Sequence, residues 1–157
     1  MEHLALNGGV KIRKKPFPKH PIIGDEEKRQ VLEVLESGNI STFIASPGEN
    51  FLGGKKIREF ENKFAKKIGT TYGVAFNSAT SALHAAVVAV GVLPGEEVIV
   101  PPYTFTSTAT CALMHNAIPV FCDVKKDTYC LDPAKLESVT SKLSKAVIPV
   151  HLFGHPC

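Results

Sequence analysis

An α/β fold with a mostly parallel sheet and flanking helices is the class that this sequence predicts, on three observations. From Tyr72 onward, short apolar runs alternate with segments of helical periodicity, which is typical of parallel strands joined by right-handed crossovers. The runs Val98–Val100 and Val147–Val150 are nearly continuous, as expected where both faces of a strand are covered. An apolar content of 44% with 21% charged residues is that of a globular protein.

Two helices are predicted before this alternation begins. In Asp25–Ser37, apolar residues at helical spacing follow an acidic first turn, and Gly38 comes after the end. In Lys55–Ile68, apolar residues fall three and four positions apart, and Gly69 ends the run. The glycine-rich stretch Asn39–Gly54 between them is predicted to be a loop.

The later part of the chain is predicted to contain four strands and three helices. The strands are Tyr72–Phe76, Glu97–Val100, Ile118–Asp123 and Lys145–Val150. The helices are Ser78–Val90, Phe105–His115 and Pro133–Val139. Residues 25–157 therefore read as one α/β domain that we expect to be incomplete. Because its parallel sheet needs both faces covered, we expect the chain alone to associate or aggregate.

Residues 1–24 form a basic arm with five cationic residues and three prolines. Such an arm suits an anionic partner, and solvated lysines at a loose chain end explain it equally. No aromatic-and-basic pattern accompanies it, so we expect no nucleic acid partner. No apolar run is long enough to cross a membrane, and the start lacks a signal-peptide core, so a cytoplasmic protein is expected.

The four cysteines are irregularly spaced and predict neither a zinc site nor a disulfide framework, so they are interpreted as reduced thiols. His151 and His155 have a metal-ligand spacing for a helix, but Gly154 and Pro156 disfavour a helix there. We therefore predict no metal site.

The segment Tyr72–Leu83 reads as a strand, a small polar turn and the start of a helix. The first amides of a helix have no partner within it, and the helix dipole adds positive potential, so a phosphate can bind there. Because neither a dinucleotide nor a P-loop glycine pattern is present, a single phosphate is expected. Ordinary capping by Asn77, Ser78 or Thr80 explains the same residues.

Aromatic residues follow the strand Glu97–Val100, at the sheet edge where ligands of open α/β folds bind. Phe105 is the candidate to lie flat against a ring held beside the phosphate. A core phenylalanine at a helix start is the alternative interpretation.

Eight segments, taken together in their order and spacing, resemble one family over residues 17–156. They are Phe51–Gly54, Arg58–Glu61, Asn77–His84, Pro94–Pro101, Tyr103–Thr106, Pro119–Val124, Leu131–Pro133 and Pro149–Gly154. The chain resembles the N-terminal half of the DegT/DnrJ/EryC1/StrS family of aminotransferases, which depend on pyridoxal 5'-phosphate and mostly act on nucleotide-linked keto-sugars in polysaccharide biosynthesis. The resemblance implies the large domain of a fold-type I, aspartate-aminotransferase-like enzyme.

The resemblance also implies roles for three residues. Thr80 and Ser81 hold the cofactor phosphate, mainly through backbone N–H groups, and Phe105 stacks on the pyridine ring. It further implies a homodimer, a nucleotide-sugar substrate and an amino donor such as glutamate. One departure is Ala79, where the family often has glycine, and alanine fits only if φ stays negative there.

In this family, the Schiff-base lysine and the aspartate facing the pyridine nitrogen follow the segment that matches Pro149–Gly154. No residue of this chain is therefore nominated as catalytic, and we expect the chain not to turn over alone. A dehydratase of the same family, with histidine in place of the lysine, is an alternative. A non-catalytic interaction or regulatory module that keeps the fold is a second alternative. A dinucleotide-binding domain is a third, which rests on the sheet pattern only.

Overall fold

The computed structural model describes residues 3–157, and the chain divides into two units, the first ending at Arg58 and the second running Glu59–Cys157. The first unit contains η1 (Ala5–Asn7) and α1 (Asp25–Glu36), and α2 (Lys55–Ile68) begins in it. Both α-helices confirm their predicted ranges to within one residue, and no helix or strand occurs between residues 39 and 54. Among the described residues, no helix is both long and apolar enough to span a bilayer.

Polar contacts fix the helices of the first unit locally. The amide of Gly24 donates to Oε2 of Glu27 at 2.7 Å, which caps the start of α1 and lowers the pKa of that carboxyl group. Lys56, in the first turn of α2, donates to Gln30 Oε1 at 2.6 Å and to Glu33 Oε2 at 2.9 Å. The apolar stripe of α1 stays exposed, so these contacts rather than a core hold it.

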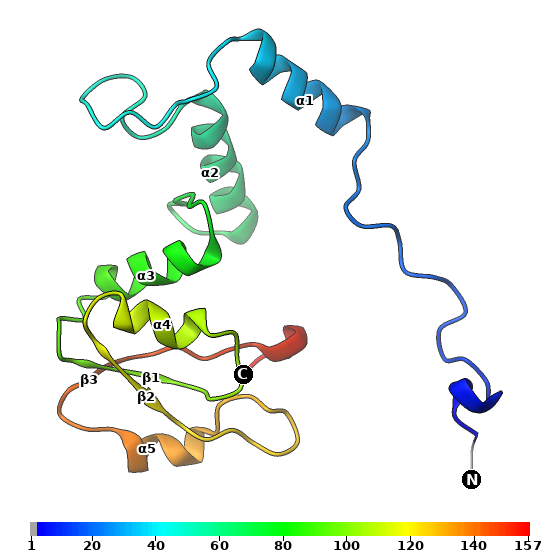
Figure 1. The fold of residues 1–157 in the computed structure, drawn as a ribbon, viewed down its shortest axis with the longest axis vertical. Helices are drawn as coiled ribbons and strands as arrows, with labels where there is room; N and C mark the ends of the chain where they lie inside the picture. The colour runs from blue at the N-terminus through cyan, green and yellow to red at the C-terminus, as the bar shows by residue number, and fades with distance from the viewer. Residues whose placement is uncertain (1–2) are drawn as a thin grey trace. The chain divides into compact units, whose positions relative to one another are not determined.

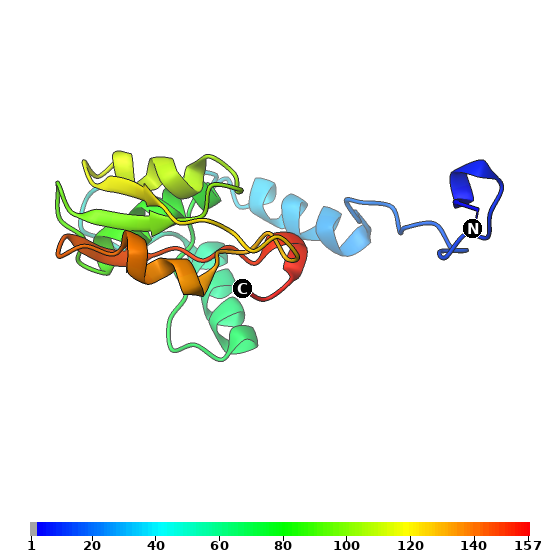
Figure 2. The ribbon, with the colours of Figure 1, turned by 90° about the horizontal axis from the view of Figure 1, so that it is seen from below.

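A three-stranded parallel sheet is the centre of the second unit. Its strands are β1 (Glu97–Val100), β2 (Ile118–Phe121) and β3 (Ser144–Val147), in the order β2-β1-β3. Both pairings with β1 are parallel, which confirms the predicted sheet type. Figure 2 shows the strands as one layer between helices.

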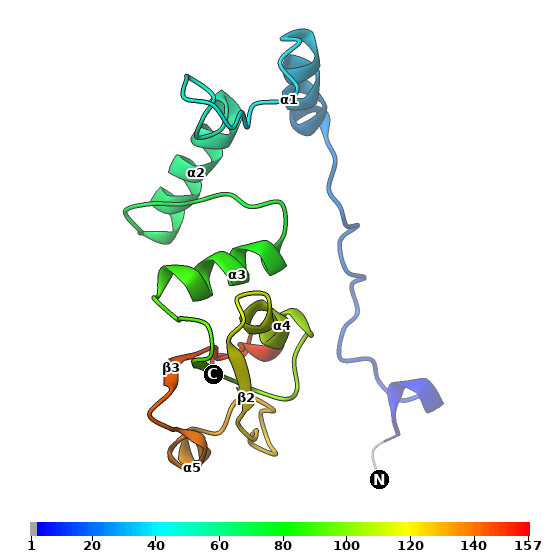
Figure 3. The ribbon, with the colours of Figure 1, turned by 60° about the vertical axis from the view of Figure 1, so that its left-hand side comes forward.

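Helices cover both faces of this sheet. α3 (Ala79–Ala89) and α4 (Ser107–Leu113) pack against each other on one face, and α5 (Leu136–Val139) lies on the other (Figures 1 and 3). Two short 3₁₀ helices, η2 (Pro133–Lys135) and η3 (Leu152–Gly154), complete the unit. The predicted strand and helix alternation is therefore confirmed from residue 79 onward.

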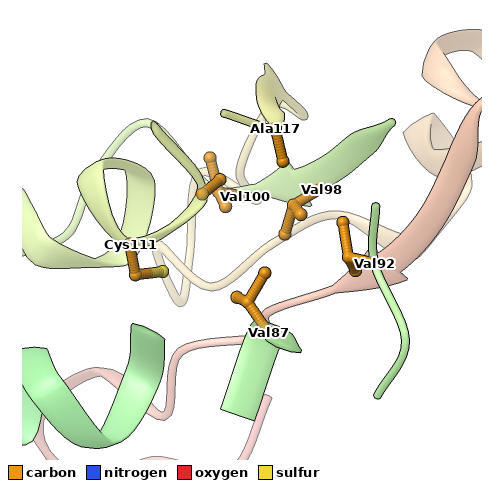
Figure 4. Packing of buried hydrophobic residues seen from close by; sticks show 7 residues of the cluster. Val87, Val92, Val98, Val100, Cys111 and Ala117 are labelled. Carbon is orange, nitrogen blue, oxygen red and sulfur yellow. The ribbon is translucent and has the colours of Figure 1, made fainter. Parts of the chain in front are cut away.

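The central strand β1 is buried on both sides because its side chains alternate between two clusters. Val98 and Val100 point towards the helix pair, where they pack with Val87 of α3 and Cys111 of α4 (Figure 4). Ile99 packs in the second cluster, whose members are Cys122, Leu131 and flanking residues of the α5 side. This double burial explains why the strand reads as an unbroken apolar run.

The predicted strand Tyr72–Phe76 is wrong, because no strand forms there. Tyr72 is 84% exposed and Val74 is 73% exposed. The amide of Ala75 donates to the carboxylate of Glu61 at 2.8 Å instead of to a neighbouring strand. A strand exists only as part of a ladder, and residues 3–157 supply no chain that pairs with this segment.

Several helices and strands are also shorter at one end than predicted. α4 begins at Ser107 rather than at Phe105, β2 ends at Phe121, and β3 ends at Val147. The amide of Ile148 still donates to the carbonyl of Ile99 at 2.9 Å, one residue beyond the end of β3.

Glu97 fastens the turn before β3 to the start of β1, and this contact predicts a pH effect. Its Oε2 accepts hydrogen bonds from the hydroxyls of Ser141 at 2.6 Å and Ser144 at 2.7 Å, which lower the pKa of Glu97. Because these bonds favour the ionised carboxylate, their stabilisation is present above the pKa of an unfolded-chain glutamate and is lost as pH falls through the lower folded-state pKa.

Replacing Ser141 with alanine is therefore expected to raise the pKa of Glu97 towards its ordinary value, as measured by NMR titration of the carboxyl carbon. Ser138→Ala is the matched control, because that hydroxyl donates to the carbonyl of Lys135 instead. An unchanged Glu97 titration in Ser141→Ala would show that the serine hydroxyl does not cause the shift.

Candidate functional site

The polar turn before α3 and the aromatic loop after β1 lie at the same edge of the sheet. In Figure 1, α3 and α4 both begin on the side towards which β1 runs. The turn Asn77–Ser78 precedes α3, and the loop Pro101–Thr106 joins the carboxyl end of β1 to α4. The tertiary structure thus places the two predicted site segments at the ligand-binding edge of an open α/β sheet.

Ser78 is the N-cap of α3. Its backbone is extended, with φ −157° and ψ 156°, and its hydroxyl oxygen accepts a hydrogen bond from the amide of Ser81 at 3.1 Å. The two hydroxyl oxygens of Ser78 and Ser81 are 3.0 Å apart. Capping therefore does occur here, and it occupies the Ser81 amide that the family resemblance assigns to phosphate.

Two amides of the first turn remain free for a ligand. Within residues 3–157, no acceptor is found for the N–H groups of Ala79 and Thr80, which point out of the helix start. Capping and anion binding are therefore compatible, because Ser78 satisfies one donor and leaves two. The helix dipole adds positive potential at the same point.

Ala79 stands where the family often has glycine, and its φ is negative, as alanine requires there. In the described part of the chain, positive φ angles at residues other than glycine occur at Asn116, Tyr129 and Phe153. Since Ala79 is not among them, its Cβ causes no backbone strain, and glycine is not required for this turn.

Phe105 lies in the loop before α4 and is 76% exposed. The interpretation as a core phenylalanine is therefore wrong. The loop around it is held in place: the amide of Thr108 donates to the carbonyl of Phe105 at 3.0 Å, and the hydroxyls of Thr104 and Thr108 are 2.9 Å apart. A ring that is exposed on a fixed loop presents a face for stacking against a planar ligand.

One aromatic pair at this loop was not predicted from the sequence. The rings of Tyr103 and Tyr129 have centroids 5.7 Å apart and an interplanar angle of 51°. Tyr103 belongs to the same loop as Phe105, and this position in the sequence could have indicated it as a site residue. Tyr129 lies 26 positions away in the sequence, in a turn with φ 56°, and only the fold brings it there.

A groove of about 480 Å³ adjoins the start of α3. It is mostly apolar, and its lining includes Phe60, Phe64, Val74, Phe76, Ser78 and Ala79. Gly73 allows close packing beside it, since a Cβ there would stand 2.8 Å from the carbonyl oxygen of Glu61. This groove was not predicted from the sequence, because part of its lining is the segment that was predicted to be a strand.

His151, near the C-terminal end, makes a local hydrogen bond. Nδ1 of His151 accepts a hydrogen bond from the amide of Cys157 at 2.9 Å. Within residues 3–157, no three His, Cys, Asp or Glu side chains converge as a metal site would require.

Over most of its length, this chain is similar in sequence to known proteins. It is 43% identical over 137 residues to a spore coat polysaccharide biosynthesis protein of Bacillus subtilis, covering 87% of this chain and 32% of that protein. It is 39% identical over 137 residues to GDP-perosamine synthase of Caulobacter vibrioides, covering 87% of this chain and 34% of that protein. The chain thus spans about a third of the length of these relatives.

Solved structures also match the fold of this chain. A protein of Streptococcus pneumoniae described as a sugar aminotransferase, solved in its PLP form, matches with a TM-score of 0.76 and 34% sequence identity. The match covers 87% of this chain and 32% of that one. The family model for DegT/DnrJ/EryC1/StrS aminotransferases matches residues 21–157. This chain therefore belongs to the DegT/DnrJ/EryC1/StrS aminotransferase family.

Proposed function

We propose that this chain supplies the phosphate- and ring-binding part of a pyridoxal 5'-phosphate site in an aminotransferase that transfers an amino group, with glutamate as donor, to a nucleotide-linked keto-sugar. The observation that carries the proposal is the pair of free amides at Ala79 and Thr80 on the same sheet edge as the exposed ring of Phe105.

The residues present fit this cofactor. Pyridoxal 5'-phosphate carries one phosphate and one flat ring, and the site offers a helix start without a dinucleotide loop beside one exposed aromatic ring. When bound, the cofactor supplies an electron-withdrawing ring to the amine carbon of the substrate. The roles of this chain's residues are binding and orientation: Ala79 and Thr80 donate to the phosphate, the Ser81 hydroxyl adds a third donor, and Phe105 fixes the ring plane.

The names of the relatives support the substrate class. One is a GDP-perosamine synthase and another acts in spore coat polysaccharide biosynthesis, so a sugar carried on a nucleotide is the substrate class that we propose here.

As the resemblance implies, the working form that we propose is a homodimer. Sedimentation of the chain over a concentration series measures this directly, and a monomer at all concentrations would contradict it.

Pyridoxamine 5'-phosphate is the best probe of the site, because it has the phosphate and the ring but no aldehyde that would react with lysines. Phe105→Ala is expected to weaken its binding by about threefold to tenfold, since an aromatic pair contributes about 0.5–1.5 kcal/mol beyond buried area. Titration of the intrinsic fluorescence of the probe measures the dissociation constant.

Leu93→Ala is the control, because it removes a large exposed apolar side chain, 61% exposed, from the loop that leads into the amino end of β1. Its affinity for the probe is expected to equal that of the unaltered chain. If both substitutions weaken binding equally, or if Phe105→Ala has no effect, Phe105 does not stack on the ring.

A further inference from the structure

We propose that Tyr129 is a positioning residue for Phe105: its ring braces Tyr103 and thereby fixes the loop that presents Phe105. The inference rests on the proposed function, in which Phe105 stacks on the cofactor ring, and it assigns a role at that site to a residue outside the loop. It starts from one aromatic contact between two segments that follow neighbouring strands.

The loop of residues 101–106 and the hairpin of residues 124–131 leave the same end of the sheet (Figure 1). Val100, the last residue of β1, is paired with Phe121, the last residue of β2. The amide of Cys122 donates to the carbonyl of Val100 at 2.9 Å, so the two strands stay together up to their carboxyl ends. The two segments therefore start from neighbouring points.

The first half of the loop depends on a ring contact. Within residues 3–157, no hydrogen bond is found for the amide or the carbonyl of Tyr103. The hydrogen bonds of this loop come later, between the hydroxyls of Thr104 and Thr108 and from the amide of Thr108 to the carbonyl of Phe105. The rings of Tyr103 and Tyr129, with centroids 5.7 Å apart and an interplanar angle of 51°, form a favourable tilted pair. This pair is therefore the brace for the start of the loop.

Tyr129 stands on a well-anchored support. Its amide donates to the carbonyl of Lys125 at 2.9 Å, and the amide of Lys125 donates to the carbonyl of Cys130 at 2.9 Å. Val124 and Leu131 form an antiparallel bridge at the base of the hairpin, and Leu131 belongs to the second buried cluster of the core. The Tyr129 ring is thus tied through the hairpin to the core, and it transmits this support to the loop.

A braced loop improves binding because less freedom is lost when the ligand arrives. Where a loop samples several conformations, the apparent affinity falls by the fraction of molecules in which the binding residue is correctly placed. Since Tyr129 acts through Phe105, the loss of affinity on removing the Tyr129 ring should not exceed the loss on removing the Phe105 ring. This upper limit distinguishes a brace from a direct contact.

Replacing Tyr129 with alanine is expected to weaken the binding of pyridoxamine 5'-phosphate by about twofold to fivefold, within the range for one aromatic pair. Tyr103→Ala removes the same contact from the loop side and is expected to do the same, so the test does not depend on the folding of one variant. Tyr129→Phe keeps the ring and should bind as the unaltered chain does. Lys126→Ala, a change in the same hairpin outside the ring pair, is the matched control. Titration of the fluorescence of the probe measures each affinity.

The double variant with Phe105→Ala and Tyr129→Ala separates positioning from direct contact. It is expected to bind the probe as weakly as Phe105→Ala alone, because without the Phe105 ring nothing is left to position. A further loss of about twofold or more in this background would mean that Tyr129 touches the ligand, and the proposal would be overturned. Equal losses in Tyr129→Phe and Tyr129→Ala would overturn it as well, because the hydroxyl would then be the active group.

Backbone ¹⁵N relaxation of the chain without ligand tests the brace independently of the cofactor. In Tyr129→Ala, the amides of Tyr103 and Phe105 are expected to show lower order parameters, whereas Tyr129→Phe leaves them unchanged. Unchanged order in Tyr129→Ala would overturn the proposal even if the probe binds. A loosened loop together with an unchanged affinity in Phe105→Ala would support the brace and contradict the proposed function, which keeps the two failures apart.

Discussion

Replacing Ile99 with alanine is expected to lower the free energy of unfolding of the second unit by about 2–5 kcal/mol. Ile99 is 1% exposed and lies in the central strand, where it packs in the cluster with Cys122 and Leu131. Its loss leaves a cavity between the sheet and the α5 side, and strands on both sides of β1 restrict collapse into it. Urea unfolding followed by circular dichroism measures the change as a lower midpoint at an unchanged slope.

Two substitutions calibrate this result. Ile99→Val removes one methylene from the same site and is expected to cost about 0.5–1.5 kcal/mol. Leu93→Ala, at an exposed position, is expected to change the free energy of unfolding by less than about 0.5 kcal/mol. Equal effects of Ile99→Ala and Leu93→Ala would mean that β1 is not the centre of the core.

Replacing Ala79 with proline is expected to weaken binding of pyridoxamine 5'-phosphate by about tenfold to a hundredfold. Proline removes one of the two free amides at the start of α3, and a hydrogen bond to a charged group contributes about 1.5–3 kcal/mol. The helix should survive, because proline is tolerated at the first helical position. The extended backbone of Ser78 also suits a residue that precedes proline. Titration of the probe's fluorescence measures the affinity.

Pyridoxamine without its phosphate is the matched control for this variant. Its weak binding is expected to be the same for Ala79→Pro and the unaltered chain, because the lost amide contacts phosphate alone. Melting temperatures of the two proteins confirm that α3 is intact. Equal loss of affinity for both ligands would place the phosphate elsewhere and would contradict the proposed site.

The local sequence pattern was sufficient to predict the helices and strands whose packing or pairing partners lie within the described chain. Glu97–Val100 was predicted with its observed bounds, because an unbroken apolar run marks a strand covered on both faces. Lys55–Ile68 was predicted with its observed bounds as well, because helical spacing and a closing glycine are local signals. Tyr72–Phe76 has the same kind of apolar run and forms no strand, since a ladder needs a neighbour that the run itself does not specify.

The features of the candidate site likewise divide into those that the local sequence indicated and those that only the fold shows. Ser78 and Phe105 were nominated from residue type and position, and Thr80 and Ser81 were nominated as phosphate-binding residues from the family resemblance, but which amides stay free was not predicted. The hydroxyl of Ser78 could have turned to any donor of the first turn, and only the fold shows that it takes the amide of Ser81. Tyr129 and the groove beside α3 had no local signal, because residues far apart in the sequence build them.

By itself, the sequence determined the α/β class, the family and the two segments of the candidate site, since periodicity, turn residues and motif order are properties of neighbouring residues. The tertiary structure alone decided that both segments share one sheet edge, that Phe105 is exposed, and that the ring of Tyr129 contacts Tyr103. The physical reason is that parallel pairing and helix packing bring distant segments together, and contacts of that kind leave no period in the chain.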